Sequence, residues 1–182
     1  MIKLNTERLI IRDLCISDLE NHHKLISDNN VMKYLQDIKT NSIEESKENL
    51  LRAINDIESE NRKFYFFLIE NKLTNEFIGE IGYTVTKNTP YGKLVHLGYF
   101  IKEDYWNKGY VTEALKRVIK FAFEEDNVYR ISTGCVKENI GSEKVMQKNG
   151  LIKEAEYKEY VLHEGKLKDR VEYRLLKTEW KK

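Results

Sequence analysis

The chain has 182 residues, which is the usual size of one domain. Its 31 basic and 30 acidic residues leave a formal net charge of +1, and this near balance argues against a polycationic surface that binds nucleic acid. Hydrophobic residues make up 41% and charged residues 34% of the chain. This composition is typical of a folded domain with a heavily charged surface.

The sequence lacks the marks of membrane, secreted and metal-binding proteins. No run approaches the ~18 apolar residues of a membrane span, and the first residues lack the apolar core of a signal peptide. Cys15 and Cys135 lie far apart, and neither has a C-x-x-C partner. We therefore expect reduced thiols, no metal ligands, no membrane partner and a cytoplasmic location.

The first half of the chain predicts a strand, two helices and three consecutive strands. Ser17 with Glu20, and Ser42 with Glu45, have the spacing of a helix capping box. The predicted helices therefore cover residues 17–27 and 43–60. Runs of aromatic and β-branched residues predict the strands. These strands cover residues 9–11, 63–70, 77–86 and 94–101.

The second half predicts a helix, a strand, a short helix and two late strands. Apolar residues with helical spacing predict a helix over residues 110–125, and Gly150 suits the end of a helix over 142–149. The strands cover 128–136, 157–162 and 170–176. We therefore expect an α/β (α+β) fold, in which one mostly antiparallel mixed sheet is flanked by about four helices, in a single domain over residues 1–182.

The segment from residue 97 to 115 carries the clearest chemical signal. A strand ends, a short loop follows, and a helix begins near Gly109. The start of a helix offers unpaired backbone N–H groups and a partial positive charge. Gly109 permits close approach to a ligand, and Lys108 adds a cation. The pattern indicates a pyrophosphate site, although an ordinary turn before a helix has the same appearance.

This segment resembles motif A of the GCN5-related N-acetyltransferase (GNAT) superfamily. Its pattern, Arg/Gln-x-x-Gly-x-Gly/Ala, aligns with residues 106–111, with Trp106 at the first position and Val111 at the last. Other motifs, from about residue 4 to 180, are similar to the branch of ribosomal-protein N-terminal acetyltransferases. They include Thr6-Glu7-Arg8-Leu9, Glu138-Asn139 with Ser142, Lys148-Asn149-Gly150-Leu151, Asp169, Tyr173 and Trp180.

The resemblance implies acetyl-coenzyme A as co-substrate, bound where the fourth and fifth predicted strands splay apart. Backbone amides of residues 107–112 would hold the pyrophosphate, and the N–H of Phe100 or Ile101 would polarise the thioester carbonyl. The cofactor-binding residues implied are Phe100, Ile101, Asn107, Lys108, Gly109, Tyr110, Val111, Thr112, Asn139 and Ser142.

Two residues are candidates for proton transfer. The resemblance makes Ser142 the donor to the leaving thiolate, although its position equally suits the N-cap of the short helix. His96 is the candidate base because imidazole titrates near neutral pH. A structural role for His96 remains the alternative, with Glu80 as a second acceptor. The glutamate that serves as base in the ribosomal-type relatives would align near Val161.

The acceptor side is less defined by the sequence. Four tyrosines are candidates to line it, with packing in the sheet as the alternative role. They are Tyr83, Tyr99, Tyr157 and Tyr160. The resemblance also implies a homodimer.

The resemblance implies an N-acetyltransferase that works by direct attack of a primary amine. An α-amine has a pKa near ~7.8 and a lysine-type amine one near ~10.4, so their deprotonation differs by about 3.5 kcal/mol. The lack of an obvious dedicated base favours a protein or peptide N-terminus as acceptor. The alternatives are a small amine, such as a polyamine or an aminoglycoside, and a non-catalytic acyl-coenzyme A-binding module.

Overall fold

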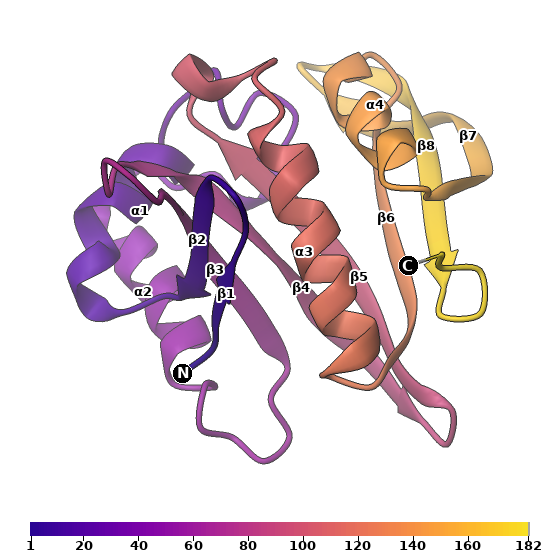
Figure 1. Cartoon of the computed structure of the whole chain (residues 1–182). Helices are drawn as coiled ribbons and strands as arrows, with labels where there is room; N and C mark the ends of the chain where they lie inside the picture. The colour runs from indigo at the N-terminus through magenta and orange to yellow at the C-terminus, as the bar shows by residue number, and fades with distance from the viewer. Residues whose placement is uncertain (182) are drawn as a thin grey trace.

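A single mixed sheet organises the computed structural model, which describes residues 1–181 (Figure 1). In that part of the chain the sheet has eight strands in the order β1-β2-β3-β4-β5-β6-β8-β7. All neighbours are antiparallel except β5 and β6. The strands are β1 (Lys3–Asn5), β2 (Leu9–Asp13), β3 (Phe64–Asn71), β4 (Phe77–Thr89), β5 (Gly92–Ile101), β6 (Val128–Val136), β7 (Ile152–His163) and β8 (Lys166–Leu176).

Helices cover both faces of the sheet. The α-helices are α1 (Leu19–Ile26), α2 (Ile43–Ile54), α3 (Tyr110–Glu124) and α4 (Ile140–Lys148). Short 3-10 turns cover Ile16–Asp18, Gln36–Ile38 and Glu103–Tyr105. None of the helices in the described part of the chain is long and apolar enough to cross a membrane.

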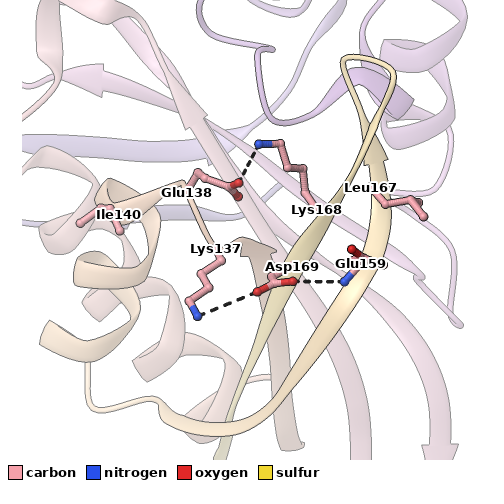
Figure 2. A pocket seen from close by; sticks show the side chains of 7 residues that line it. All are labelled: Lys137, Glu138, Ile140, Glu159, Leu167, Lys168 and Asp169. Carbon is pink, nitrogen blue, oxygen red and sulfur yellow. Dashed lines mark hydrogen bonds and ion pairs between the residues drawn. The ribbon is translucent and has the colours of Figure 1, made fainter.

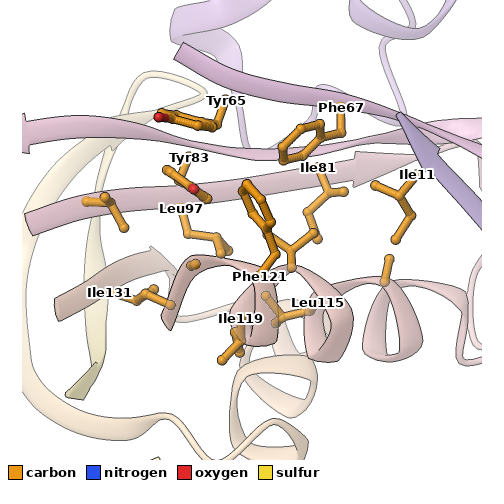
Figure 3. Close-up of a cluster of buried hydrophobic side chains, with 14 of the residues drawn as sticks. Ile11, Tyr65, Phe67, Ile81, Tyr83, Leu97, Leu115, Ile119, Phe121 and Ile131 are labelled. Atoms are coloured by element: carbon orange, nitrogen blue, oxygen red, sulfur yellow. The ribbon is translucent and has the colours of Figure 1, made fainter. Parts of the chain in front are cut away.

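The main core lies between α3 and one face of the sheet. Figure 3 shows Leu115, Ile119 and Phe121 of α3 beside Ile81 of β4 and Leu97 of β5. Side chains alternate between the faces of a strand. The residues next to Ile81 and Leu97 therefore point to the opposite face. A second, smaller core under α1 and α2 covers part of that face, and its buried members are Leu14, Leu25, Leu50, Ala53, Leu68 and Phe77.

The sheet splays apart between β5 and β6, as expected for the fourth and fifth predicted strands. The two strands pair only where Lys93–His96 of β5 lie beside residues 128–132 of β6. Beyond that point β5 continues beside β4 alone, and β6 continues beside β8 alone. We call the space between residues 97–101 and 133–136 the opening.

The predicted helix starts are only partly right. Ser42 caps α2 by accepting a hydrogen bond from the N–H of Glu45, which confirms that prediction. The pairing of Ser17 with Glu20 is wrong, because Asp18 instead accepts from the N–H of Cys15 and α1 begins only at Leu19.

Other boundaries differ because side chains bind the backbone beyond the helices. The second helix ends at Ile54 rather than near residue 60, and Asp56 accepts hydrogen bonds from the N–H groups of Lys63 and Phe64 as the chain turns into β3. The fourth helix begins at Ile140 rather than at Ser142. The short edge strand β1 and the full length of β7 were not expected from the sequence.

Candidate active site

The turn into α3 forms a cradle of free backbone N–H groups. Within residues 1–181, the six N–H groups from Asn107 to Thr112 have no hydrogen-bond acceptor, and bonding resumes where Glu113 N donates to Gly109 O at 3.0 Å. Asn107 and Gly109 have positive φ angles of 58° and 80°. Left-handed residues in such a turn gather successive N–H groups around a concavity that suits an anion. We call residues 107–112 the N–H cradle.

Gly109 serves the cradle through its backbone conformation rather than through its small size. A Cβ atom built there would meet only the Arg8 Nη2 atom, at 3.5 Å. Its φ of 80° is nevertheless costly for any residue with a side chain. Val111, where motif A prefers a smaller residue, packs its side chain against the main core and leaves its N–H free.

The loop between β1 and β2 holds the cradle from outside. Glu113, in the first turn of α3, accepts hydrogen bonds from Thr6 Oγ1 at 2.6 Å, from Arg8 N at 2.9 Å and from Arg8 Nε at 2.6 Å. Arg8 also donates to Lys108 O at 3.2 Å and lies 4.4 Å from the centre of the Tyr110 ring. Thr6 and Arg8 match a family motif in the sequence, but that match predicts no role for them. These residues lie more than a hundred positions before Glu113 in the chain, so no local sequence pattern predicts their hydrogen bonds to it.

The strand register decides which backbone groups of β5 face the opening. Lys102 donates its N–H to Ile78 O of β4 at 2.9 Å. Bonded and unbonded residues alternate along an antiparallel pair. Phe100 therefore bonds toward β4, whereas Ile101 turns its N–H toward the opening. Of the two residues predicted to polarise a carbonyl, only Ile101 has this orientation.

Two further features shape the same edge of β5. The indole Nε1 of Trp106 donates to the carbonyl oxygen of Ile101 at 3.0 Å, which ties the cradle to the end of the strand. Tyr99 has the same backbone parity as Ile101, so its N–H also faces the opening.

Ser142 lies across the opening, in the first turn of α4. Its hydroxyl oxygen is 2.9 Å from the Tyr99 hydroxyl. The N-cap of α4 is Asn139, whose side chain accepts from Ser142 N at 3.1 Å. The alternative role of Ser142 as the cap is therefore wrong, and its hydroxyl is not committed to the helix backbone. Burial raises the pKa of the neighbouring Cys135 thiol to about 11 despite a hydrogen bond with Ser142, so this thiol stays protonated.

His96 approaches the opening from the other face of the sheet. On β5 its side chain points away from Leu97 and Tyr99, and both His96 and Gly98 are exposed there. A Cβ atom on Gly98 would meet nothing within 4 Å. Burial of part of the ring, with help from Arg170, lowers the pKa of His96, although Glu172 opposes this. The imidazole is therefore neutral at pH 7 and able to accept a proton.

Glu80 and Tyr83 do not form part of this surface. Glu80 is 5% exposed, and its carboxylate is 2.7 Å from His22 Nδ1 beneath α1, so it is a buried partner of a histidine and not a surface acceptor. Tyr83 is 1% exposed in the main core, where its hydroxyl donates to Asp126. Its predicted place on the acceptor side is wrong. Tyr157 and Tyr160 are exposed and stack on each other with ring centres 4.9 Å apart.

A hollow of about 720 Å³ lies between the start of α4 and the β7–β8 hairpin (Figure 2). Within it Lys168 pairs with Glu138 at 2.8 Å, and Lys137 lies 4.0 Å from Asp169. The carboxylate of Glu159 has no cation within pairing distance among residues 1–181. The remaining lining residues are Ile140 and Leu167.

Comparison with known proteins shows which family the chain belongs to. The sequence profile of the acetyltransferase (GNAT) domain family matches residues 8–152, which is most of the chain. The chain belongs to the GNAT acetyltransferase family. This GNAT protein is 29% identical over 180 residues to the uncharacterized N-acetyltransferase p20 of Bacillus licheniformis, with 99% of each chain covered. It is 28% identical over 132 residues to the ribosomal protein uS5 alanine N-acetyltransferase of Escherichia coli, covering 71% of this chain and 66% of the other.

Solved structures agree with the GNAT assignment. A GNAT-family acetyltransferase from Bacillus anthracis superimposes with a TM-score of 0.83 at 27% identity, covering 98% of this chain and all (100%) of the other. Spermidine N-acetyltransferase from Vibrio cholerae, in complex with CoA and spermine, also has a TM-score of 0.83, but at 19% identity, with 96% and 98% covered. At that identity the likeness shows the fold alone. The GNAT chain is therefore an N-acetyltransferase whose acceptor is not set by its relatives.

Proposed function

We propose that this enzyme transfers the acetyl group of acetyl-coenzyme A to the N-terminal α-amine of a protein or peptide, and that residues 1–182 act as one domain. The N–H cradle, with six backbone donors free of any acceptor in the described chain, is the observation that carries the co-substrate. A pyrophosphate would supply acceptors for these donors without needing a basic surface. This reconciles an anionic ligand with a net charge of +1.

The residues around the opening would hold acetyl-coenzyme A at two places, the pyrophosphate at the N–H cradle and the thioester beside β5. Asn107 to Thr112 would hold the pyrophosphate, and Asn139 would stay at the start of α4 to keep Ser142 in place. The N–H of Ile101 would donate to the thioester oxygen, where negative charge develops during attack. Phe100 would contribute its side chain beside the co-substrate rather than its N–H.

The proton-transfer groups lie on opposite faces of the opening. His96 would take the proton of the attacking amine, directly or through a water molecule. Ser142 would donate a hydrogen bond to the sulfur as the carbon–sulfur bond breaks and its electron pair moves to sulfur. The proton released by the amine equals the one that the thiolate finally gains, so the reaction needs no external donor.

The choice of a peptide N-terminus rests on two supports. The relative from E. coli acetylates the alanine of a ribosomal protein, and an α-amine is about one tenth neutral at pH 7, so one ordinary imidazole suffices as base. A polyamine is the second candidate. The unpaired Glu159 carboxylate in the hollow beside α4 favours it, because it would attract a cationic acceptor.

An acceptor screen tests both candidates. The protein is incubated with acetyl-coenzyme A and either peptides with free or blocked N-termini or polyamines, and thiol release is measured. We expect turnover of free peptide N-termini and none of blocked ones. Faster turnover of polyamines would contradict the peptide assignment and support the second candidate. Calorimetry that detects no coenzyme A binding would overturn the co-substrate assignment itself.

A further inference from the structure

The Tyr99 hydroxyl joins β5 to α4 across the opening. Its oxygen lies 2.9 Å from Ser142 Oγ and 3.1 Å from the Ser142 carbonyl oxygen. The ring packs against the main core. Burial raises the pKa of Tyr99 well above its ordinary range, although the bond to Ser142 acts against this. Tyr99 therefore keeps its proton and acts as a hydrogen-bond donor at every working pH.

The hydroxyl hydrogens of Tyr99 and Ser142 can be arranged in two ways. Each hydroxyl has one hydrogen and can accept from the other. In one arrangement Tyr99 donates to the Ser142 carbonyl, and Ser142 donates back to Tyr99, so no hydrogen faces the opening. In the other, Tyr99 donates to Ser142 Oγ, and the Ser142 hydrogen is free for another acceptor. The two arrangements interconvert by rotation about C–O bonds without moving a heavy atom.

We propose that Tyr99 is a positioning residue for the reaction. By donating to Ser142 Oγ, it frees the Ser142 hydroxyl hydrogen and directs it toward the leaving sulfur. This role rests on the function proposed above. Negative charge that develops on the sulfur favours this arrangement, since it offers a stronger acceptor than the tyrosine oxygen. The bond to Asn139 holds the Ser142 backbone in place, so the orientation of its hydroxyl is the remaining freedom. Cys135 is the other group beside this hydroxyl, and a thiol is a weak partner.

A double-mutant cycle tests this role. Tyr99→Phe removes only the hydroxyl, and we expect kcat to fall about three- to tenfold, the range for one hydrogen bond, with KM for acetyl-coenzyme A little changed. In the Ser142→Ala variant, kcat should fall further. In the Ser142→Ala background, Tyr99→Phe should have no additional effect, because the group that it positions is gone.

A matched control separates this role from support of α4. Tyr173, on β8, also bonds to α4 through its hydroxyl, at 2.7 Å from Glu143 and 3.0 Å from Gln147, and has no hydrogen bond to Ser142. Tyr173→Phe should lower the melting temperature without lowering kcat, and any small effect should persist unchanged in the Ser142→Ala background. Circular dichroism and melting curves establish that every variant is folded.

The outcomes distinguish this inference from the function on which it rests. Additive losses from Tyr99→Phe and Ser142→Ala, in an otherwise active enzyme, would overturn the role of Tyr99 alone. If no amine is turned over, slow hydrolysis of acetyl-coenzyme A breaks the same carbon–sulfur bond and supplies the same cycle. Absence of any thiol release from the wild-type protein would overturn both proposals.

Discussion

Gly109 is the single residue on which the shape of the N–H cradle depends most directly. Its φ of 80° lies in the left-handed region, where a residue with a Cβ atom loses ~1–2 kcal/mol. We predict that Gly109→Ala will raise the Kd for coenzyme A about tenfold or more, because relief of this strain turns the donors away from one another. Calorimetry with coenzyme A measures the change.

Gly165 provides the control for this substitution. It has a similar φ of 73° in the β7–β8 turn, and a Cβ atom there would meet nothing within 4 Å. Gly165→Ala should lower the melting temperature to a similar degree and leave the Kd for coenzyme A unchanged. Equal losses of affinity in both variants would mean that Gly109 acts through general stability.

The role proposed for His96 predicts how kcat/KM depends on pH. The folded pKa of His96 lies below the ordinary value of 6.5, so the ring is already neutral at pH 6.5 and becomes protonated only at lower pH. Only the neutral form accepts a proton, so the contribution of His96 to kcat/KM should rise with pH and level off by about pH 7. In His96→Gln this limb should disappear, with a loss of about a hundredfold.

The measurement is a profile of kcat/KM between about pH 5 and 9 with one peptide acceptor. Deprotonation of the peptide amine adds a second limb near pH ~8, which both enzymes should share. His23→Gln is the control, since His23 of α1 bonds to Ser46 of α2, away from β5. A His96→Gln enzyme that keeps the lower limb would show that another group is the base.

At the scale of elements, the start of α3 is held by the segment that leads into β2. Hydrogen bonds from Thr6 and Arg8 outweigh burial and hold the pKa of Glu113 below its ordinary value, so the carboxylate stays charged near neutral pH. The Arg8 side chain is 42% exposed, so its ion pair contributes little to stability, about 1 kcal/mol or less. Its main consequence should be the orientation of the cradle.

We predict that Arg8→Ala will raise KM for acetyl-coenzyme A by about fivefold or less, as expected for an exposed ion pair worth about 1 kcal/mol or less, with kcat nearly unchanged. Steady-state kinetics at saturating acceptor measures both constants. Arg117→Ala is the control, because Arg117 pairs with Glu125 at the opposite end of α3 at 3.1 Å. A fall in kcat with KM constant would contradict a role in holding the cradle.

At the scale of the whole molecule, a buried ion pair fixes the N-terminal strands to the rest of the sheet. Asp13 is fully buried (0% exposed) and accepts hydrogen bonds from Arg62 Nη2 at 2.6 Å and from Ile2 N at 2.6 Å. Removal of one member leaves the other charge buried without a partner.

We predict that Asp13→Ala will lower the free energy of unfolding by ~3–5 kcal/mol, the usual effect of breaking a buried pair. Urea denaturation measures it, with the exposed Asp37→Ala as control. Since a domain has only ~5–15 kcal/mol in total, the variant should also unfold at a clearly lower temperature. A change below about 1 kcal/mol would mean that the pair is replaced by solvent contacts.

Local chemistry made several parts of this protein predictable. The strand β3 and the helix α3 follow from their runs of apolar residues, and the start of α2 follows from Ser42. The N–H cradle near Gly109 follows from a glycine between a strand and a helix. These features depend on residues within one or two turns of each other, so their physical causes lie in the sequence itself.

The tertiary structure decided what depends on register and on distant partners. It turned Ile101 rather than Phe100 toward the opening, because the ladder with β4 sets the direction of each N–H. It gave the cap of α4 to Asn139, which left the Ser142 hydroxyl for Tyr99. The sequence alone thus determined most of the elements, the family and the place of the N–H cradle. Which groups face that site was settled only when strands and helices far apart in the chain packed together, because a hydrogen bond depends on direction as well as on residue type.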